Sequence, residues 1–247
     1  MPDVLTERDG AIARVTLNRP EALNAITTSL ARELEAALRA LGEDERVHVI
    51  VVRGAGGTFS VGGDFKHLQE LRARGRDAMA ELFDAFGAAC AAVDEVPVPV
   101  VAAVEGHALA GGFELMLAAD VAIVRDDARI GDHHSNFAMV PGGGSTQRLA
   151  RVAGRARALG LILTGDSITG AQAVQWGLAY LAAEAGRFDG ADGELAEQLA
   201  GKDRRAQATI KGLVRGGLEG SLDQGLARER EAVVEHLAAE GAMDRFA

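Results

Sequence analysis

Two uninterrupted apolar runs constrain the fold of this chain more than any other feature. VHVIVVRG spans residues 47–54, is rich in β-branched side chains and ends in glycine, and a second run spans residues 98–104. A strand that is apolar on both faces is covered on both sides, as in parallel sheets flanked by helices. Each run follows a stretch with helical periodicity, so strands alternate with helices, and this order predicts an α/β protein.

The N-terminal segment predicts a hairpin followed by a helix. Asp9-Gly10 separates VLTER from AIARVTLN, and this dipeptide favours the positive φ angles of a tight turn. Thr27 and Thr28 are candidate N-caps for the helix, which we expect to end at Gly42. The leucines of this helix recur at helical spacing, at positions 30, 34, 38 and 41.

The second half of the chain changes character near residue 155. Residues 121–124 predict a third buried strand, but beyond residue 155 the pattern is mostly helical, with Thr169 as a predicted N-cap. No low-complexity linker or fixed-period repeat divides the chain. We therefore expect an α/β core over residues 1–190 and a helical C-terminal region over residues 191–247.

Charge and cysteine content narrow the classes of partner. The formal net charge of −10 opposes general attraction to nucleic acid or to anionic membranes. The first ten residues, MPDVLTERDG, lack the basic and apolar pattern of a secretory signal, and no run approaches about 20 uncharged apolar residues. The single cysteine, Cys90, cannot form an intramolecular disulfide. We expect a soluble cytoplasmic protein that binds neither nucleic acid nor membrane.

Three common enzyme motifs are absent. GAGGTF at residues 54–59 lacks the third glycine of a dinucleotide-binding loop, and GGGSTQ at residues 142–147 lacks the lysine of a P-loop. The chain also contains no G-x-S-x-G nucleophile elbow. These observations argue against a dinucleotide-dependent oxidoreductase, a P-loop nucleotidase and a serine hydrolase of that type.

Three glycine-bearing segments carry a family resemblance. They are TFSVGGDFK at 58–66, VEGHALAGGFELMLAAD at 104–120 and IGDHHSNFAMVPGGGSTQRL at 130–149, with NRPEALNA and AVQWGLA as further matches. In this order they resemble the enoyl-CoA hydratase/isomerase (crotonase) family over nearly the whole chain. The resemblance implies a crotonase-like spiral of ββα units, an acyl-CoA thioester substrate, no metal or separate cofactor, and a homotrimer or a dimer of trimers.

The resemblance assigns a backbone oxyanion hole to two of these glycines. A thioester carbonyl gains negative charge when its α-carbon becomes carbanion-like, and two fixed N–H donors stabilise the resulting enolate. By resemblance the donors are Gly63 and Gly111. The helix that begins at Gly111 would direct its positive end toward the oxyanion. The alternative is that these glycines only permit tight turns and close packing.

Glu114 and His134 are the candidate acid and base residues. Glu114 lies in an apolar stretch and matches a catalytic glutamate of the hydratases. At the position of the family's second glutamate this chain has His134, preceded by His133 and Asp132. Histidine exchanges protons near neutral pH, so Glu114 and His134 would form a mixed pair, with Asp132 fixing an imidazole. The alternative for His134 is an ordinary loop histidine bonded to backbone.

For coenzyme A, the resemblance places adenine against the backbone from Gly62 through Asp64 to Phe65. Lys66 is the candidate for the anionic phosphates, or alternatively a solvated lysine at a helix start. The departure at His134 leaves other functions open. These are isomerisation, decarboxylation, ring hydration or hydrolysis of a CoA thioester, or a non-catalytic acyl-CoA-binding role.

Overall fold

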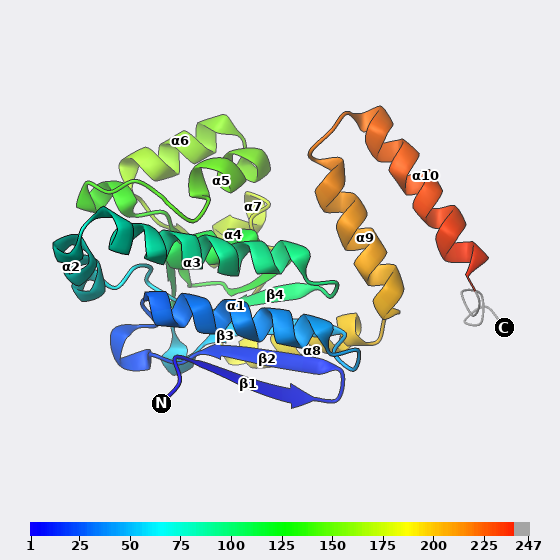
Figure 1. Ribbon diagram of the computed structural model, residues 1–247, viewed down its shortest axis with the longest axis horizontal. Coiled ribbons are helices and arrows are strands. Elements are labelled where there is room, and N and C mark those ends of the chain that lie inside the picture. The colour runs from blue at the N-terminus through cyan, green and yellow to red at the C-terminus, as the bar shows by residue number, and fades with distance from the viewer. Residues whose placement is uncertain (240–247) are drawn as a thin grey trace.

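The computed structural model describes residues 1–239 and has two sheets surrounded by helices (Figure 1). The strands are β1 Val4–Asp9, β2 Ile12–Leu17, β3 Val49–Gly54, β4 Val100–Val104, β5 His107–Leu109, β6 Val121–Arg125, β7 Arg129–Gly131, β8 Ile168–Thr169 and β9 Leu181–Ala183. The α-helices are α1 Thr28–Glu43, α2 Phe65–Arg74, α3 Arg76–Glu95, α4 Gly111–Ala118, α5 Ser145–Ala153, α6 Arg155–Thr164, α7 Gly170–Gln175, α8 Phe188–Ala200, α9 Arg204–Gly217 and α10 Leu222–Ala238.

The larger sheet has the strand order β1-β2-β3-β4-β6-β9 and is parallel except for the β1–β2 hairpin. The smaller sheet has the order β5-β7-β8. As predicted, Gly10 turns the hairpin with φ of +56°, and the register pairs Asp9 with Ile12. The α/β class is therefore confirmed.

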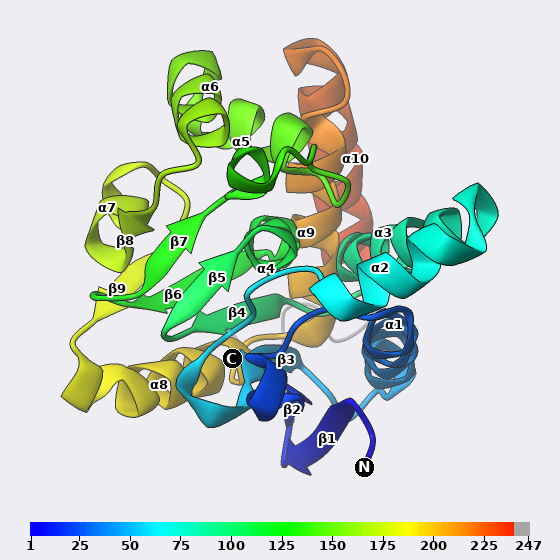
Figure 2. The same cartoon turned by 90° about the vertical axis from the view of Figure 1, so that its left-hand side faces the viewer.

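The apolar run of residues 47–54 is buried on both faces, as its composition predicts. Ile50 and Val52 point into the main core, which α1, α3 and α4 cover, whereas Val49 and Val51 point into a second cluster. Phe188 and the rest of the buried face of α8 complete that second cluster. Figure 2 shows α8 on one side of the sheet and α1, α3 and α4 on the other.

Helix α1 begins where the sequence predicts but ends later. The Thr27 side chain accepts a hydrogen bond from the N–H of Leu30 at 3.2 Å, a cap that typically contributes about 1 kcal/mol. The expectation that Gly42 ends the helix is wrong, because α1 continues to Glu43. A Cβ on Gly42 would lie 2.7 Å from Cγ1 of Val96, so this glycine permits close packing instead.

The second half of the chain contains short strands that its helical pattern did not reveal. β8 has two residues and β9 has three, too few for a two-residue periodicity to be recognised. β9 adds a parallel edge to the larger sheet beside β6. The predicted cap at Thr169 is confirmed, because its side chain accepts from the N–H of Gln172.

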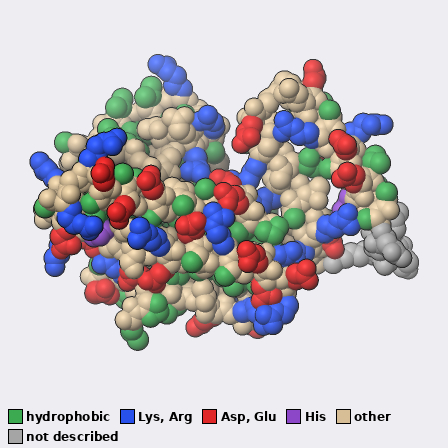
Figure 3. All heavy atoms as spheres, in the orientation of Figure 1, with side chains coloured by type: hydrophobic (Ala, Val, Ile, Leu, Met, Phe, Trp, Pro, Cys, Tyr) green, Lys and Arg blue, Asp and Glu red, His purple; other side chains and the backbone are tan. Residues whose placement is uncertain are grey.

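The C-terminal helices differ in how they pack. Helix α8 lies against the sheet, and the expected domain boundary at residue 190 falls inside it. Helices α9 and α10 contain no buried residue and form a separate lobe beside the rest (Figures 1 and 3). The last eight residues of the expected C-terminal region lie outside the described part. Within residues 1–239, no helix has both the length and the apolar character needed to cross a membrane.

Candidate active site

The site residues selected from the sequence, except Gly62, line one cavity with a volume of about 420 Å³. It lies between α2, α3, the N-terminus of α4 and the loop that follows β7, and its wall is mostly apolar. The polar lining includes Glu114, His133 and His134. The apolar lining includes Ile26, Leu68, Leu82, Phe83, Phe86, Phe137 and Met139.

Helix α4 carries Glu114 into this cavity from the core. The helix is apolar on every side, and Phe113, Leu115 and Met116 are buried around Glu114, whose own exposure is 2%. The residue before the helix, Ala110, has φ of +47° and ψ of −118°, a backbone conformation that normally requires glycine. This conformation orients the Ala110–Gly111 peptide at the cavity wall.

Backbone donors at the start of α5 hold one oxygen of Glu114. Oε1 accepts hydrogen bonds from the N–H of Gly143 at 2.7 Å and from the N–H of Ser145 at 3.1 Å. A Cβ on Gly143 would lie 2.3 Å from Cε1 of Phe86 and 2.8 Å from Oε2 of Glu114, so the close approach requires glycine. The second oxygen, Oε2, lies 3.9 Å from Nε2 of His134.

The pKa of Glu114 is raised above its usual value. Burial is the main cause, because the charged carboxylate loses its hydration. The hydrogen bonds from Ser145 and Gly143 and the charge of His134 act in the opposite direction and limit the rise. A carboxyl group with a raised pKa beside a cavity is suited to proton transfer near neutral pH.

His134 begins a 3-10 turn, His134–Phe137, directly after the positive φ of His133, and is 8% exposed. Its Nδ1 lies 3.0 Å from Oδ1 of Asp132, which is fully buried. Burial acts to raise the pKa of Asp132, but the hydrogen bonds and charge of His134 outweigh it, and the pKa is lowered. An ionised Asp132 only accepts hydrogen bonds, so Nδ1 of His134 must carry the proton. Nε2 is then the atom left to face the cavity.

The side chains of Glu114 and His134 meet across a short gap. His134 Nε2 lies 3.9 Å from Glu114 Oε2, too far for a direct hydrogen bond. Burial acts to lower the pKa of His134, but the hydrogen bond and charge of Asp132 and the charge of Glu114 outweigh it, and the pKa is raised. The arrangement places two proton-transfer groups on either side of one small volume.

The amide groups of Gly63 and Gly111 lie in the same cavity wall. Neither N–H donates a hydrogen bond to any group within residues 1–239, so both are available to a ligand. The two segments approach closely at Gly62, which has φ of +93° and whose Cβ would lie 2.8 Å from the nitrogen of Gly111. Gly62 therefore brings the two amides together, although it does not line the cavity itself.

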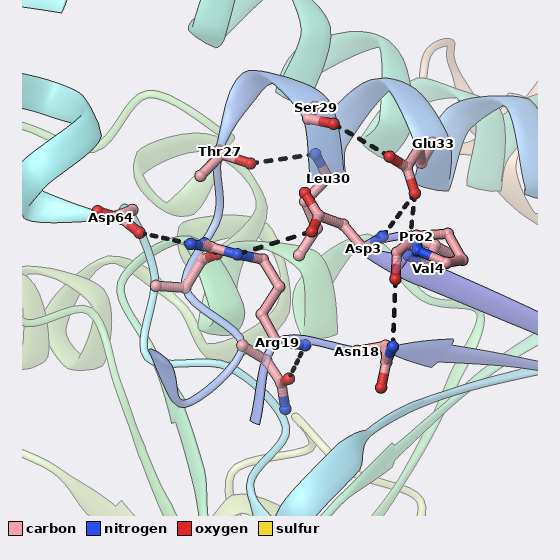
Figure 4. Close-up of polar contacts among 12 residues, drawn as sticks. Pro2, Asp3, Val4, Asn18, Arg19, Thr27, Ser29, Leu30, Glu33 and Asp64 are labelled. Carbon is pink, nitrogen blue, oxygen red and sulfur yellow. Dashed lines mark hydrogen bonds and ion pairs between the residues drawn. The ribbon is translucent and has the colours of Figure 1, made fainter. Parts of the chain in front are cut away.

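The other residues selected for coenzyme A differ in their contacts and in their exposure. Asp64, Phe65 and Lys66 line the cavity, but the Asp64 side chain caps α2 and forms an ion pair with Arg19 at 2.9 Å (Figure 4). Phe65 is half-exposed, and its ring lies edge-on to that of Phe137 with centroids 4.9 Å apart. Lys66 is exposed at the cavity wall.

Sequence reasoning missed the residues that hold Glu114. The GGGST segment lacks the lysine of a phosphate loop, but glycines directly before a helix start are also a signal for donated N–H groups. Lys211, a possible neighbour of coenzyme A in the sequence, instead forms an ion pair with Asp120 at 2.8 Å, and only 8% of its side chain is exposed. Its ammonium group also donates to the carbonyls of Val93 and Val98, so it anchors α9 to the core.

Comparison with known proteins gives matches over almost the whole chain. A sequence model described as enoyl-CoA hydratase/isomerase matches residues 7–246. The chain is 31% identical over 245 residues to the short-chain-enoyl-CoA hydratase of Clostridium acetobutylicum, covering 98% of this chain and 92% of that protein.

Solved structures share the fold over almost the whole chain. An enoyl-CoA hydratase from Bacillus anthracis superposes with a TM-score of 0.93 at 28% identity, covering 99% of this chain and 94% of the other. A putative enoyl-CoA hydratase from Thermobifida fusca, solved in complex with CoA, has a TM-score of 0.85 at 28% identity and covers 96% and 93% of the two chains.

Proposed function

Because the chain belongs to the enoyl-CoA hydratase/isomerase family, we propose that it adds water to the double bond of a 2-enoyl-CoA thioester and catalyses the reverse dehydration. One observation carries this proposal. The free N–H groups of Gly63 and Gly111 share a cavity with Glu114 and His134, whose facing atoms lie 3.9 Å apart. A water molecule that bridges two acceptors or donors at hydrogen-bond distance fits such a gap.

The proposed mechanism uses the amides to hold the thioester oxygen. As water attacks C3, electrons move onto this oxygen and form an enolate, which the N–H groups of Gly63 and Gly111 stabilise. Loss of one such donor typically costs about 3–4 kcal/mol of transition-state stabilisation. The N-terminal end of α4 adds a favourable field at the same point.

The two proton transfers fall to Glu114 and His134. The ionised Glu114 removes a proton from water, the hydroxyl bonds to C3, and the imidazolium of His134 delivers its Nε2 proton to C2. The Asp132 carboxylate stabilises this imidazolium. The mixed pair thus supplies one base and one acid, and the reverse direction exchanges their roles.

The acyl-CoA would enter beside α2. We assign the CoA phosphates to Lys66, supported by its exposed position at the cavity wall and by the further basic residues Arg72 and Arg74 on the same helix. The apolar lining supports an acyl group without charge. No separate cofactor or metal enters this mechanism.

The test follows the absorbance of the conjugated enoyl thioester, with crotonyl-CoA and with longer and branched analogues. We expect the wild-type protein to remove this absorbance and Glu114→Gln to remove it far more slowly. Binding of the substrates without turnover would contradict the hydratase proposal. It would favour an isomerase, decarboxylase or hydrolase, or a non-catalytic acyl-CoA-binding protein.

We further propose a homotrimer, or a dimer of trimers, in the cytoplasm, where Cys90 stays reduced. The support for assembly is the apolar surface of α9 and α10, which the other residues of the described range 1–239 leave exposed (Figure 3). Its large apolar residues are Ile210, Val214, Leu218, Leu222, Leu226, Val233, Val234 and Leu237. A monomer in light scattering at working concentration would contradict this assembly.

A further inference from the structure

The loop that holds Glu114 is itself held by an arginine outside the cavity. Arg148 lies one turn into α5, and its guanidinium folds back so that Nη1 donates to the carbonyl oxygen of Gly143 at 3.0 Å. The N–H of the same Gly143 donates to Glu114 at 2.7 Å. A Cβ on Gly144 would lie 2.4 Å from Nη1, so glycine is needed here for the arginine to reach this carbonyl.

Arg148 is tied in turn to the C-terminal helices. Its Nη2 donates to Asp94, at the end of α3, at 3.3 Å. The other oxygen of Asp94 forms an ion pair with Arg215 of α9. Arg215 also donates to Asp120 at 2.8 Å and to the carbonyl of Ala118, the last residue of α4, at 2.9 Å. Both the loop that binds Glu114 and the end of its helix are therefore connected to α9.

We propose that Arg148 is a positioning residue for the Glu114 carboxylate, and that Arg215 of α9 supports it through their shared partner Asp94. The inference rests on the proposed function for its kinetic readout but not for its structural one. The Gly143 peptide sits between two partners, Arg148 on its carbonyl and Glu114 on its N–H. Without the arginine, this peptide loses the restraint that keeps its N–H directed at the carboxylate.

The same geometry ties Arg148 to the protonation of Glu114. The Gly143 bond acts to lower the pKa of Glu114 against the dominant effect of burial. Other ionisable side chains that act on Glu114 or are affected by it are His134, Asp132 and Cys90. Arg148→Gln and Arg148→Lys leave these three in place, but only the lysine keeps the positive charge that also acts on Cys90. A further rise of the Glu114 pKa that both variants share would therefore report the loss of the Gly143 bond and not the loss of charge.

The kinetic test compares four variants on an enoyl-CoA substrate. We expect Arg148→Gln to lower kcat by between about tenfold and a hundredfold with little change in KM, as displaced catalytic groups commonly do. Arg148→Lys should recover part of this loss, and Arg215→Gln should show a smaller loss of the same kind. Arg151→Gln is the matched control, because Arg151 lies on the same helix and, among residues 1–239, its side chain bonds only to Gln147 of that helix. Its kcat should equal that of wild type.

The pH dependence separates positioning from general stability. In Arg148→Gln, the ascending limb of kcat should move to higher pH, whereas a purely structural arginine would lower the melting temperature and leave the limb in place. An unchanged limb and an unchanged kcat per folded molecule would overturn the proposal. Crystal structures of wild type and Arg148→Gln test it without activity: the Gly143 N to Glu114 Oε1 distance should lengthen, and an unchanged distance would overturn it even if the hydratase proposal fails.

Discussion

The two sides of the site hold their proton-transfer groups by different means. Glu114 lies on a buried helix and is bonded by main-chain N–H groups of Gly143 and Ser145. His134 lies on a short turn and is bonded by a side chain, that of Asp132. Main-chain donors are present whatever the side chains are, whereas the second arrangement exists only if both side chains are present. The hold on Glu114 therefore depends on where the backbone lies, and the hold on His134 depends on one other side chain.

Removing the charge of Glu114 tests the side of the site that main-chain donors hold, and it should have the largest effect. Loss of a general base typically costs about 10²–10⁴ in rate, and we expect Glu114→Gln to fall near the upper end of that range in kcat. The glutamine keeps the size of the side chain, and its carbonyl still accepts from Gly143. Steady-state kinetics with crotonyl-CoA measures the loss. Turnover above a tenth of wild type would remove Glu114 from the mechanism.

Removing His134 tests the side of the site that a side chain holds. We expect His134→Ala to lower kcat by about 10², less than Glu114→Gln, because water that enters the vacated space can deliver the C2 proton slowly. The measurement is the same absorbance assay, with circular dichroism to establish folding. Unchanged turnover would exclude the proposed role of His134 and leave it as a loop histidine.

Asp132→Asn separates the effect of Asp132 on His134 from the effect of Glu114. In wild type the pKa of His134 is raised above its usual value of about 6.5, so activity that needs the imidazolium is present at lower pH and is lost as pH rises through the raised pKa. The asparagine removes the negative charge, so the descending limb of kcat/KM should move to lower pH. If the descending limb of the variant lies one pH unit below that of wild type, kcat/KM falls by up to about tenfold at pH values above the wild-type limb.

The control for this variant is Asp166→Asn, which changes an exposed aspartate in the loop between α6 and β8. Its limb should coincide with that of wild type. The same sign applies to stability: the contribution of the Asp132–His134 pair is present below the pKa of unfolded histidine and is lost as pH rises through the raised pKa. A descending limb unmoved by Asp132→Asn would show that Asp132 does not act on His134.

The smallest expected effect is on stability, from alanines with positive φ angles next to Glu114's helix and next to the His134 turn. Ala110 precedes α4 with φ of +47° and ψ of −118°, while Ala138 follows the His134 turn with φ of +54° and ψ of +33°. The first conformation is the more costly for alanine, so Ala110→Gly should raise the free energy of unfolding by up to about 1 kcal/mol and Ala138→Gly by less. Urea unfolding compares them. A larger gain at Ala138 would reverse this part of the comparison.

Much of the architecture is readable from local patterns. The Asp9-Gly10 hairpin, the Thr27 cap and the doubly buried run at 47–54 all appear where the sequence places them. The short strands β5, β7, β8 and β9 were not predicted, because two or three residues carry no periodicity and each depends on pairing with a distant neighbour. Gly42 shows the same limit: the sequence reveals a glycine, but only its contact with Val96 explains it.

For the site, the sequence by itself determined the chemical groups: a glutamate in an apolar helix, a histidine two residues after an aspartate, and glycines at the positions that the family resemblance assigns to oxyanion donors. Only the tertiary structure decided that Glu114 and His134 face each other, that Gly143 binds the carboxylate and that Arg148 binds Gly143. The physical reason is the separation along the sequence of the residues that interact. Turns, caps and periodicity arise from residues a few positions apart, whereas the gap between Glu114 and His134 is set by how α4, β7 and α5 pack.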